Sequence, residues 1–206
     1  MGYVRSGNLV GPVLAGLLAL AACAPAGKPA DQSMFTTDLT GLELRANALP
    51  TIVYVRPDAP PLSEFNRFIV DTAQVNYTDP GIEELTPEQV GWLQEAFHSK
   101  MVNELTRAGY EVGTRAEAGT LRISFVISGL KAPGSAVPYG IGVGEVTIEA
   151  IFRDAVSHRI NVVVLRRTQG SPVFNPSLWS TFADVDMSFD LWTRGIRETI
   201  DTAHGS

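Results

Sequence analysis

The clearest pattern in the chain is a helical repeat of apolar residues between Thr86 and Ala108. Thr86 can cap this helix, Pro87 suits its first turn, and Gln89 completes a capping box. Gly109 then provides a left-handed stop. The apolar positions recur every three or four residues and form one stripe: Val90, Leu93, Phe97, Met101 and Leu105. The pattern predicts an amphipathic helix with one buried side.

A second amphipathic helix is predicted near the C-terminus. Its apolar stripe contains Phe182, Val185, Phe189, Trp192, Ile196 and Ile200. Asp184, Asp186 and Asp190 gather near its start, where two carboxylates could perform acid–base chemistry or hold Ca²⁺. We favour a structural explanation, because acids near a helix N-terminus are stabilised by its dipole and Asp190 can pair with Arg194.

Alternating and β-branched segments predict strands over 51–55, 67–77, 121–128, 145–153 and 160–164. The last two are expected to form a hairpin in which Phe152 faces Ile160, Ala150 faces Val162, Ile148 faces Val164 and Glu145 faces Arg167. No regular βαβ alternation is present. The fold class predicted is therefore α+β, a two-layer sandwich of a mostly antiparallel sheet of five or six strands packed against two amphipathic helices.

The N-terminus has the pattern of an export signal. Residues 1–8 carry one cation, Arg5, and no acid, and Leu9 to Ala22 is almost wholly apolar. As a helix, fourteen residues would span roughly 21 Å, which is short of a hydrocarbon core of ~30 Å. The run therefore predicts a signal peptide and not a membrane span.

The end of this run, Leu20-Ala21-Ala22-Cys23, resembles a bacterial lipobox. The resemblance implies cleavage between Ala22 and Cys23 and acylation of Cys23, with palmitate-type chains, so that membrane lipid is the first partner. Cys23 is also the only cysteine in the chain, and an odd thiol in an exported protein needs a cap. The second residue of the mature protein would be Ala24 and not Asp. In a Gram-negative host, the usual sorting pattern of such lipoproteins then implies the outer membrane.

Three parts of the chain follow from these patterns. Residues 1–22 form a lipoprotein signal peptide, 23–50 a lipidated N-terminus and tether, and 51–206 a single α+β domain. The tether begins with a small, polar stretch punctuated by Pro and Gly, a linker composition.

Composition excludes some function classes. The 206 residues are 45% hydrophobic with a formal net charge of -6 and an isoelectric point near 5.1, so nucleic acid is not an expected partner. No G-x-S-x-G elbow appears, and the three histidines do not pair at metal-ligand spacing. We therefore assign no catalytic residue, metal or cofactor, and predict a protein that is not an enzyme.

Three aromatic residues are the candidates for contact with a partner. Tyr139 lies in a long loop rich in Pro and Gly, and such loops often carry contacts. Trp92 lies off the main helical stripe and Trp179 precedes the second helix, so either could be an exposed anchor.

Several short segments resemble a family of bacterial lipoproteins known as domain of unknown function 3313. The matching segments are Tyr54-Val55-Arg56-Pro57, Leu62-Ser63-Glu64-Phe65, Ile69-Val70-Asp71, Gly144 to Glu149, Arg153-Asp154, Ala183-Asp184-Val185 and Phe189 to Trp192. The family usually has a Gly in the turn after the Asp154 position, where this chain has Ala155-Val156-Ser157-His158. The resemblance covers roughly residues 50–203 and implies a lipid-anchored envelope protein, with no activity or catalytic residue.

The sequence as a whole predicts a membrane-anchored lipoprotein that acts as a binding or assembly module in the cell envelope, with an envelope protein as its partner. Two alternatives stay open. One is an accessory subunit of an envelope transport or secretion complex, and the other is a hydrolase or carbohydrate-active enzyme that uses a carboxylate pair.

Overall fold

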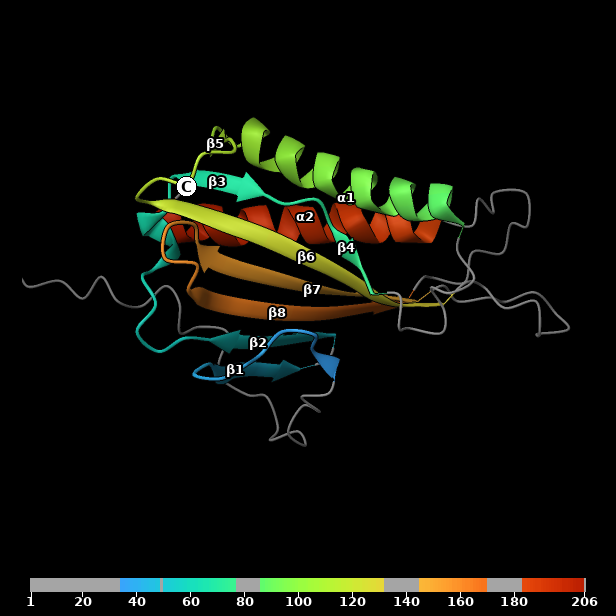
Figure 1. Ribbon diagram of the computed structural model, residues 1–206, viewed down its shortest axis with the longest axis horizontal. Helices are drawn as coiled ribbons and strands as arrows, with labels where there is room; N and C mark the ends of the chain where they lie inside the picture. The colour runs from blue at the N-terminus through green and yellow to red at the C-terminus, as the bar shows by residue number, and fades with distance from the viewer. Residues whose placement is uncertain (1–33, 49, 77–85, 132–144, 170–182, 206) are drawn as a thin grey trace, which may run out of the picture.

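A computed structural model describes residues 34–48, 50–76, 86–131, 145–169 and 183–205. In these ranges a sheet of eight strands packs against two helices (Figure 1). The strands are β1 (Glu43–Ala48), β2 (Thr51–Val55), β3 (Arg67–Val70), β4 (Gln74–Val75), β5 (Glu111–Val112), β6 (Thr120–Lys131), β7 (Glu145–Asp154) and β8 (Ile160–Gln169); the helices are α1 (Pro87–Arg107) and α2 (Ala183–His204), with a 3-10 turn at Leu62–Glu64. The predicted α+β class is confirmed, with a few more strands than expected.

The sheet has the order β1-β2-β8-β7-β6-β3-β5, with β4 also paired to β6. Neighbouring strands along β1-β2-β8-β7-β6 are antiparallel. Strands β3 and β4 run parallel to β6, and β5 runs parallel to β3. The segment predicted as one strand over 67–77 is divided into β3 and β4 around Asp71, whose N–H still donates to the Ile123 carbonyl at 2.9 Å. The sheet is therefore mixed along one edge and antiparallel in the rest.

Helix α1 begins and ends as the sequence predicts. The Gln89 N–H donates to Thr86 Oγ1 at 3.3 Å, and the Thr86 N–H donates to Gln89 Oε1 at 2.8 Å, which makes the capping box. Gly109 has a φ of 89°, the left-handed conformation expected at the end of the helix. All five residues of the predicted stripe are buried.

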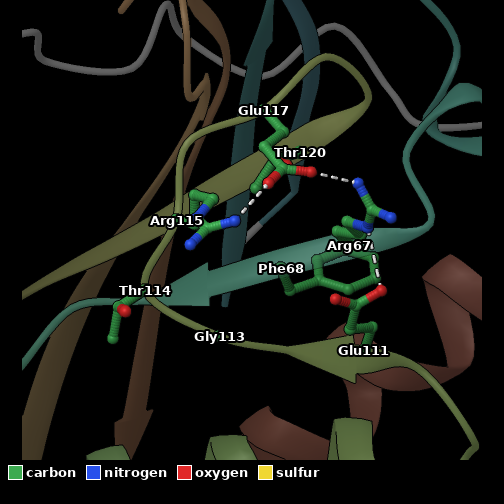
Figure 2. Close-up of a pocket in the computed structure, with 8 residues that line it drawn as sticks. All are labelled: Arg67, Phe68, Glu111, Gly113, Thr114, Arg115, Glu117 and Thr120. Atoms are coloured by element: carbon green, nitrogen blue, oxygen red, sulfur yellow. Dashed lines mark hydrogen bonds and ion pairs between the residues drawn. The ribbon is translucent and has the colours of Figure 1, made fainter.

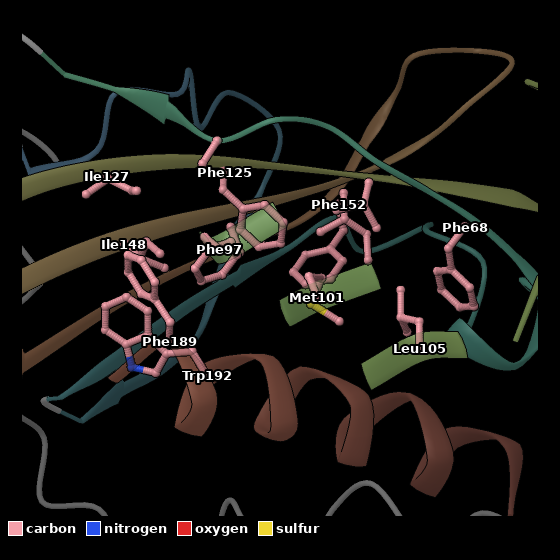
Figure 3. Packing of buried hydrophobic residues seen from close by; sticks show 14 of the residues in the cluster. Phe68, Phe97, Met101, Leu105, Phe125, Ile127, Ile148, Phe152, Phe189 and Trp192 are labelled. Atoms are coloured by element: carbon pink, nitrogen blue, oxygen red, sulfur yellow. The ribbon is translucent and has the colours of Figure 1, made fainter. Parts of the chain in front are cut away.

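Both helices pack on one face of the sheet, which we call the helix face. Phe97 of α1 is fully buried, with ring centroids 4.4 Å from Phe125 of β6 and 4.9 Å from Phe189 of α2 (Figure 3). Trp192 and Ile200 continue the buried stripe of α2. Aromatic rings therefore join the two helices to the sheet at one point.

The two helices run side by side in the same direction and are joined by charged groups (Figure 1). Lys100 donates to Asp190 at 2.6 Å and to Asp186 at 3.3 Å. Burial acts to lower the pKa of Lys100, but the bonds to both carboxylates outweigh it and raise this pKa. The predicted pairing of Asp190 with Arg194 is replaced by this contact between helices, because Lys100 lies across the groove within reach.

The register of the β7–β8 hairpin differs from the predicted one by two residues. Phe152 pairs with Val162, and Glu145 pairs with Gln169 and not with Arg167. The cause is a bulge on β8 beside Arg153, at the end of a longer turn than expected.

That turn has no glycine and closes through Asp154. The Asp154 carboxylate accepts hydrogen bonds from the Ser157 N–H at 2.7 Å and the Val156 N–H at 3.1 Å, and these bonds lower the pKa of Asp154. His158 takes a left-handed φ of 59°, the conformation for which glycine is usual. The departure from the family pattern is therefore absorbed by His158.

The second face of the sheet, opposite the helices, is also partly apolar. Its buried residues are Ile52, Tyr54, Val126, Ile151, Val163 and Leu165. Residues 34–42 pack against them through Met34, Phe35, Leu39 and Leu42, and the chain then enters β1. The domain boundary placed at Thr51 from the sequence therefore lies inside the sheet.

We expect Phe97→Ala to lower the free energy of unfolding by about 3–5 kcal/mol, because it leaves a cavity at the meeting point of both helices and the sheet. Urea unfolding of the variant would measure this loss. Leu191→Ala is the control, since Leu191 is 49% exposed and its loss should change stability by about 0.5 kcal/mol or less. Equal effects of the two variants would contradict the packing described.

Tyr110 should titrate above the ordinary pKa of a tyrosine. Burial, and then a 2.9 Å hydrogen bond from its hydroxyl to Asp201, raise its pKa to about 12 from the usual 10.0. The neutral phenol therefore stabilises the fold below pH 10, and this contribution is lost as the pH rises from 10 towards 12. Phenolate absorbance would show a late step that Tyr110→Phe removes. The absence of a phenolate step near pH 12 that Tyr110→Phe removes would refute the contact.

Candidate functional site

The second face is organised around one buried carboxylate. Glu149 of β7 is 1% exposed and accepts hydrogen bonds from the Thr36 N–H at 2.8 Å, the Thr36 hydroxyl at 2.6 Å and the Thr37 N–H at 3.0 Å. A buried carboxylate is costly unless such partners satisfy it. Glu149 therefore fixes the N-terminal segment to the middle of the sheet, 113 residues away along the sequence.

Apolar contacts support this docking on one side of Glu149. Phe35 meets Tyr54 edge-on, with ring centroids 5.3 Å apart. Tyr54 lies on β2, and its neighbour across the strands is Val163 of β8. The segment 34–42 thus covers the β2–β8 half of the second face.

A cavity of about 410 Å³ opens beside the docked threonines. Its lining residues come from the N-terminal segment and from β4, β6 and β7: Thr36, Thr37, Gln74, Val75, Asn76, Val126, Ile151 and Arg153. Arg153 is the charged residue among them, and the others offer hydroxyls, amides and apolar surface. This lining suits a polar or anionic group better than acid–base chemistry, which needs a proton acceptor near neutral pH.

A second, smaller depression of about 110 Å³ lies at the β3–β5 edge of the sheet (Figure 2). Arg67 donates to Glu111 at 2.8 Å and to Glu117 at 2.6 Å, and Arg115 lies 3.5 Å from Glu117. The hydrogen bond to Glu111 and the charges of both glutamates raise the pKa of Arg67. The two cations and two anions around this depression neutralise one another. We therefore interpret these charged side chains as a support for the edge strands β3 and β5.

Most of the site residues predicted from the sequence lie outside the described residues: Ala22, Cys23, Tyr139 and Trp179. Trp92 lies on α1 away from the buried stripe and is 39% exposed, as its position predicts. Within the residues that the structure describes, no other predicted site residue lies beside Trp92.

The acidic cluster at the start of α2 serves the helix pair. Asp186 and Asp190 both bind Lys100. The alternative of a hydrolase that uses these carboxylates as a pair therefore has no support from this cluster. Across the described ranges, no three His, Cys, Asp or Glu side chains lie close enough to hold a metal ion. Neither described helix has an apolar run long enough to cross a membrane.

Glu149 and Arg153 were not singled out from the sequence, because they occupy the polar positions of an alternating strand. A signal was present in Ile151, an apolar residue at a position that alternation assigns to the polar face. Val126 and Leu165 break the alternation of their strands in the same way. Such near-continuous apolar runs indicate burial on both faces.

The family model described as "Protein of unknown function (DUF3313)" matches residues 31–196. The chain belongs to this family. No significant match was found among curated proteins.

Solved structures show only distant similarity to the chain. A PelC dodecamer from Paraburkholderia phytofirmans is 12% identical, with a TM-score of 0.48, over 73% of this chain and 96% of the other. A Xanthomonas campestris protein of family DUF330 is 9% identical, with a TM-score of 0.46, over 68% and 86%. A minor lipoprotein from Acinetobacter baumannii is 8% identical, with a TM-score of 0.38, over 68% and 95%.

We expect Glu149→Gln to cost about 1–3 kcal/mol of stability, because the amide nitrogen cannot accept the N–H groups that the carboxylate satisfies. Residues 34–42 should also lose protection in hydrogen exchange. Glu111→Gln is the matched control, since it alters an exposed ion pair that contributes about 1 kcal/mol or less. Unchanged protection of residues 34–42 would show that Glu149 does not hold the segment.

Proposed function

We propose that this protein is a lipid-anchored envelope protein whose α+β domain is a non-enzymatic binding module. The lipobox-like Leu20-Ala21-Ala22-Cys23 supports acylation of Cys23, the only cysteine in the chain. Two or more acyl chains hold a protein stably in a membrane, whereas one does so only marginally. Ala24 supports sorting to the outer membrane of a Gram-negative bacterium.

The observation that carries the proposal is the capture of Thr36 and Thr37 by Glu149. Thr36 lies thirteen positions after Cys23, and a chain of that length spans at most roughly 45 Å. An acyl anchor at Cys23 would therefore keep the second face and its cavity within that distance of the lipid. Such a placement suits a module that meets its partner beside the membrane.

The expected partner is an envelope component, and the domain's own contribution is recognition. The cavity beside Thr36 and Thr37 presents a cation and neutral polar groups, which suits binding. The acids Asp186 and Asp190 are engaged by Lys100, so we do not propose acid–base chemistry for them.

Cys23→Ala should abolish labelling by radioactive palmitate and release the protein from the membrane fraction. The physical reason is that the proposed lipid supplies the anchoring, since an acidic chain gains nothing from an anionic lipid surface. Fractionation of cells that express the wild type or the variant would measure the release. A variant that stays in the membrane fraction would contradict the anchor.

The binding role is tested separately, by cross-linking in intact envelopes followed by capture of the protein. We expect a defined partner with the wild type, lost in Cys23→Ala, and retained in Glu111→Gln as a surface control. Anchoring without any specific cross-link would contradict the binding module while leaving the lipoprotein assignment intact.

A further inference from the structure

Three polar residues lie near one another at the end of the sheet beside the β7–β8 turn: Arg122, Arg153 and Asn161. Arg122 of β6 is paired directly with Arg153 of β7, so both side chains leave the same face of the sheet. Arg153 in turn pairs with Ile160, where the β8 bulge inserts Asn161 as the extra residue. Two like charges directly opposite each other destabilise a sheet unless something offsets them.

Within this group, several buried polar atoms lack partners. Among the described residues, nothing forms a hydrogen bond with Arg122 Nε, Arg153 Nε, or either side-chain polar atom of Asn161, which is 3% exposed. Arg56, at the same end of the sheet, shows how such an atom is ordinarily satisfied. Its Nε donates a hydrogen bond to the Ile160 carbonyl at 2.7 Å. Buried polar atoms left without partners are costly and therefore call for an explanation.

The carboxylates that the structure places on this face are already engaged. Asp71 accepts a hydrogen bond from the Ser124 hydroxyl at 2.6 Å and lies 3.8 Å from Arg122. Glu149 is satisfied by the two threonines of the N-terminal segment. Within the described part of the chain, the charge of Arg153 is thus left without a carboxylate, although the whole chain has a net charge of -6.

We propose that Arg153, with its neighbours Arg122 and Asn161, binds a phosphate group beside the cavity on the second face. This inference rests on the proposed binding role and names the chemistry of its ligand. Paired residues on antiparallel strands lie roughly 5 Å apart at their Cα atoms, so two guanidinium groups can converge on one tetrahedral oxyanion. The Asn161 amide, at the bulge beside Arg153, adds a donor. Of the three residues, Arg153 lines the cavity of about 410 Å³, which gives room for the rest of the ligand.

Phosphate fits this site better than water does. A water molecule can satisfy buried donors, but it cannot offset the positive charge of Arg153 beside that of Arg122, whose ion pair with Asp71 is long, at 3.8 Å. The planar forks of arginine match phosphate oxygens in pairs. The phosphate can come from a phospholipid headgroup, which the anchor would keep within reach, or from a soluble phosphate ester.

The test uses the acylated protein in neutral detergent micelles, titrated with inorganic phosphate and, separately, with acetate. We expect phosphate to bind, and Arg153→Gln to weaken it about tenfold or more, as the loss of one charge-assisted pair implies. Arg115→Gln is the matched control, because Arg115 is an exposed arginine whose partner is Glu117, and it should leave the affinity unchanged. If Arg153→Gln does not fold, Arg122→Gln carries the same expectation.

The source of the phosphate is decided in phosphatidylcholine nanodiscs with or without phosphatidylglycerol. If phosphatidylglycerol competes with inorganic phosphate for the wild type but not for Arg153→Gln, the site is assigned to a lipid headgroup. Phosphate binding that phosphatidylglycerol does not affect would assign it to a soluble ester. Equal affinity for acetate, equal binding by Arg153→Gln, or no binding of either phosphate source would overturn the inference. None of these results bears on acylation or on partner capture, which test the proposed function.

Discussion

The central strands of this protein carry apolar side chains on both faces, and the rest of the structure follows from the need to cover them. Sheets with two buried faces require two covering layers. The helices α1 and α2 cover one face, where Phe97, Phe125 and Phe189 meet (Figure 3). The segment 34–42, which is too short to form another helical layer, covers part of the other.

Incomplete covering explains why the second face has a cavity. The segment packs over the β2–β8 half, and Glu149 fixes its position with three hydrogen bonds. Beyond the two threonines, the β6–β7 half opens into the cavity that Arg153 lines. The contact that docks the N-terminal segment therefore also forms one wall of the cavity, so the proposed anchor and the proposed binding site share a structural element.

Charged side chains act in this fold mainly as connectors between distant segments. Lys100 joins α1 to α2 through Asp186 and Asp190, and Arg67 joins β3 to the loop around β5. Each of these two cations forms an ion pair with at least one carboxylate. Arg153 differs from them because its neighbour across the strands is another arginine, which is why we assign an external anion to it.

The sequence predicted the features that depend on neighbours a few residues apart. The limits of α1, its capping box and its buried stripe follow from short-range periodicity, as does the burial of Phe189, Trp192 and Ile200 in α2. The hairpin was predicted with its strands but with the wrong register, since a bulge beside Arg153 is invisible in an alternating pattern. The lipobox-like segment ending at Cys23 is likewise a local pattern, and acylation there stays a prediction.

Only the tertiary structure decided what meets on the second face. Thr36 and Glu149 are 113 residues apart, and no spacing rule links a threonine in an N-terminal segment to a glutamate in a strand. The same holds for Arg122, Arg153 and Asn161, because strand pairing sets the two arginines opposite each other and a bulge puts Asn161 beside them. Local periodicity fixes which side of an element is buried, but the choice of neighbour depends on how all the elements pack together.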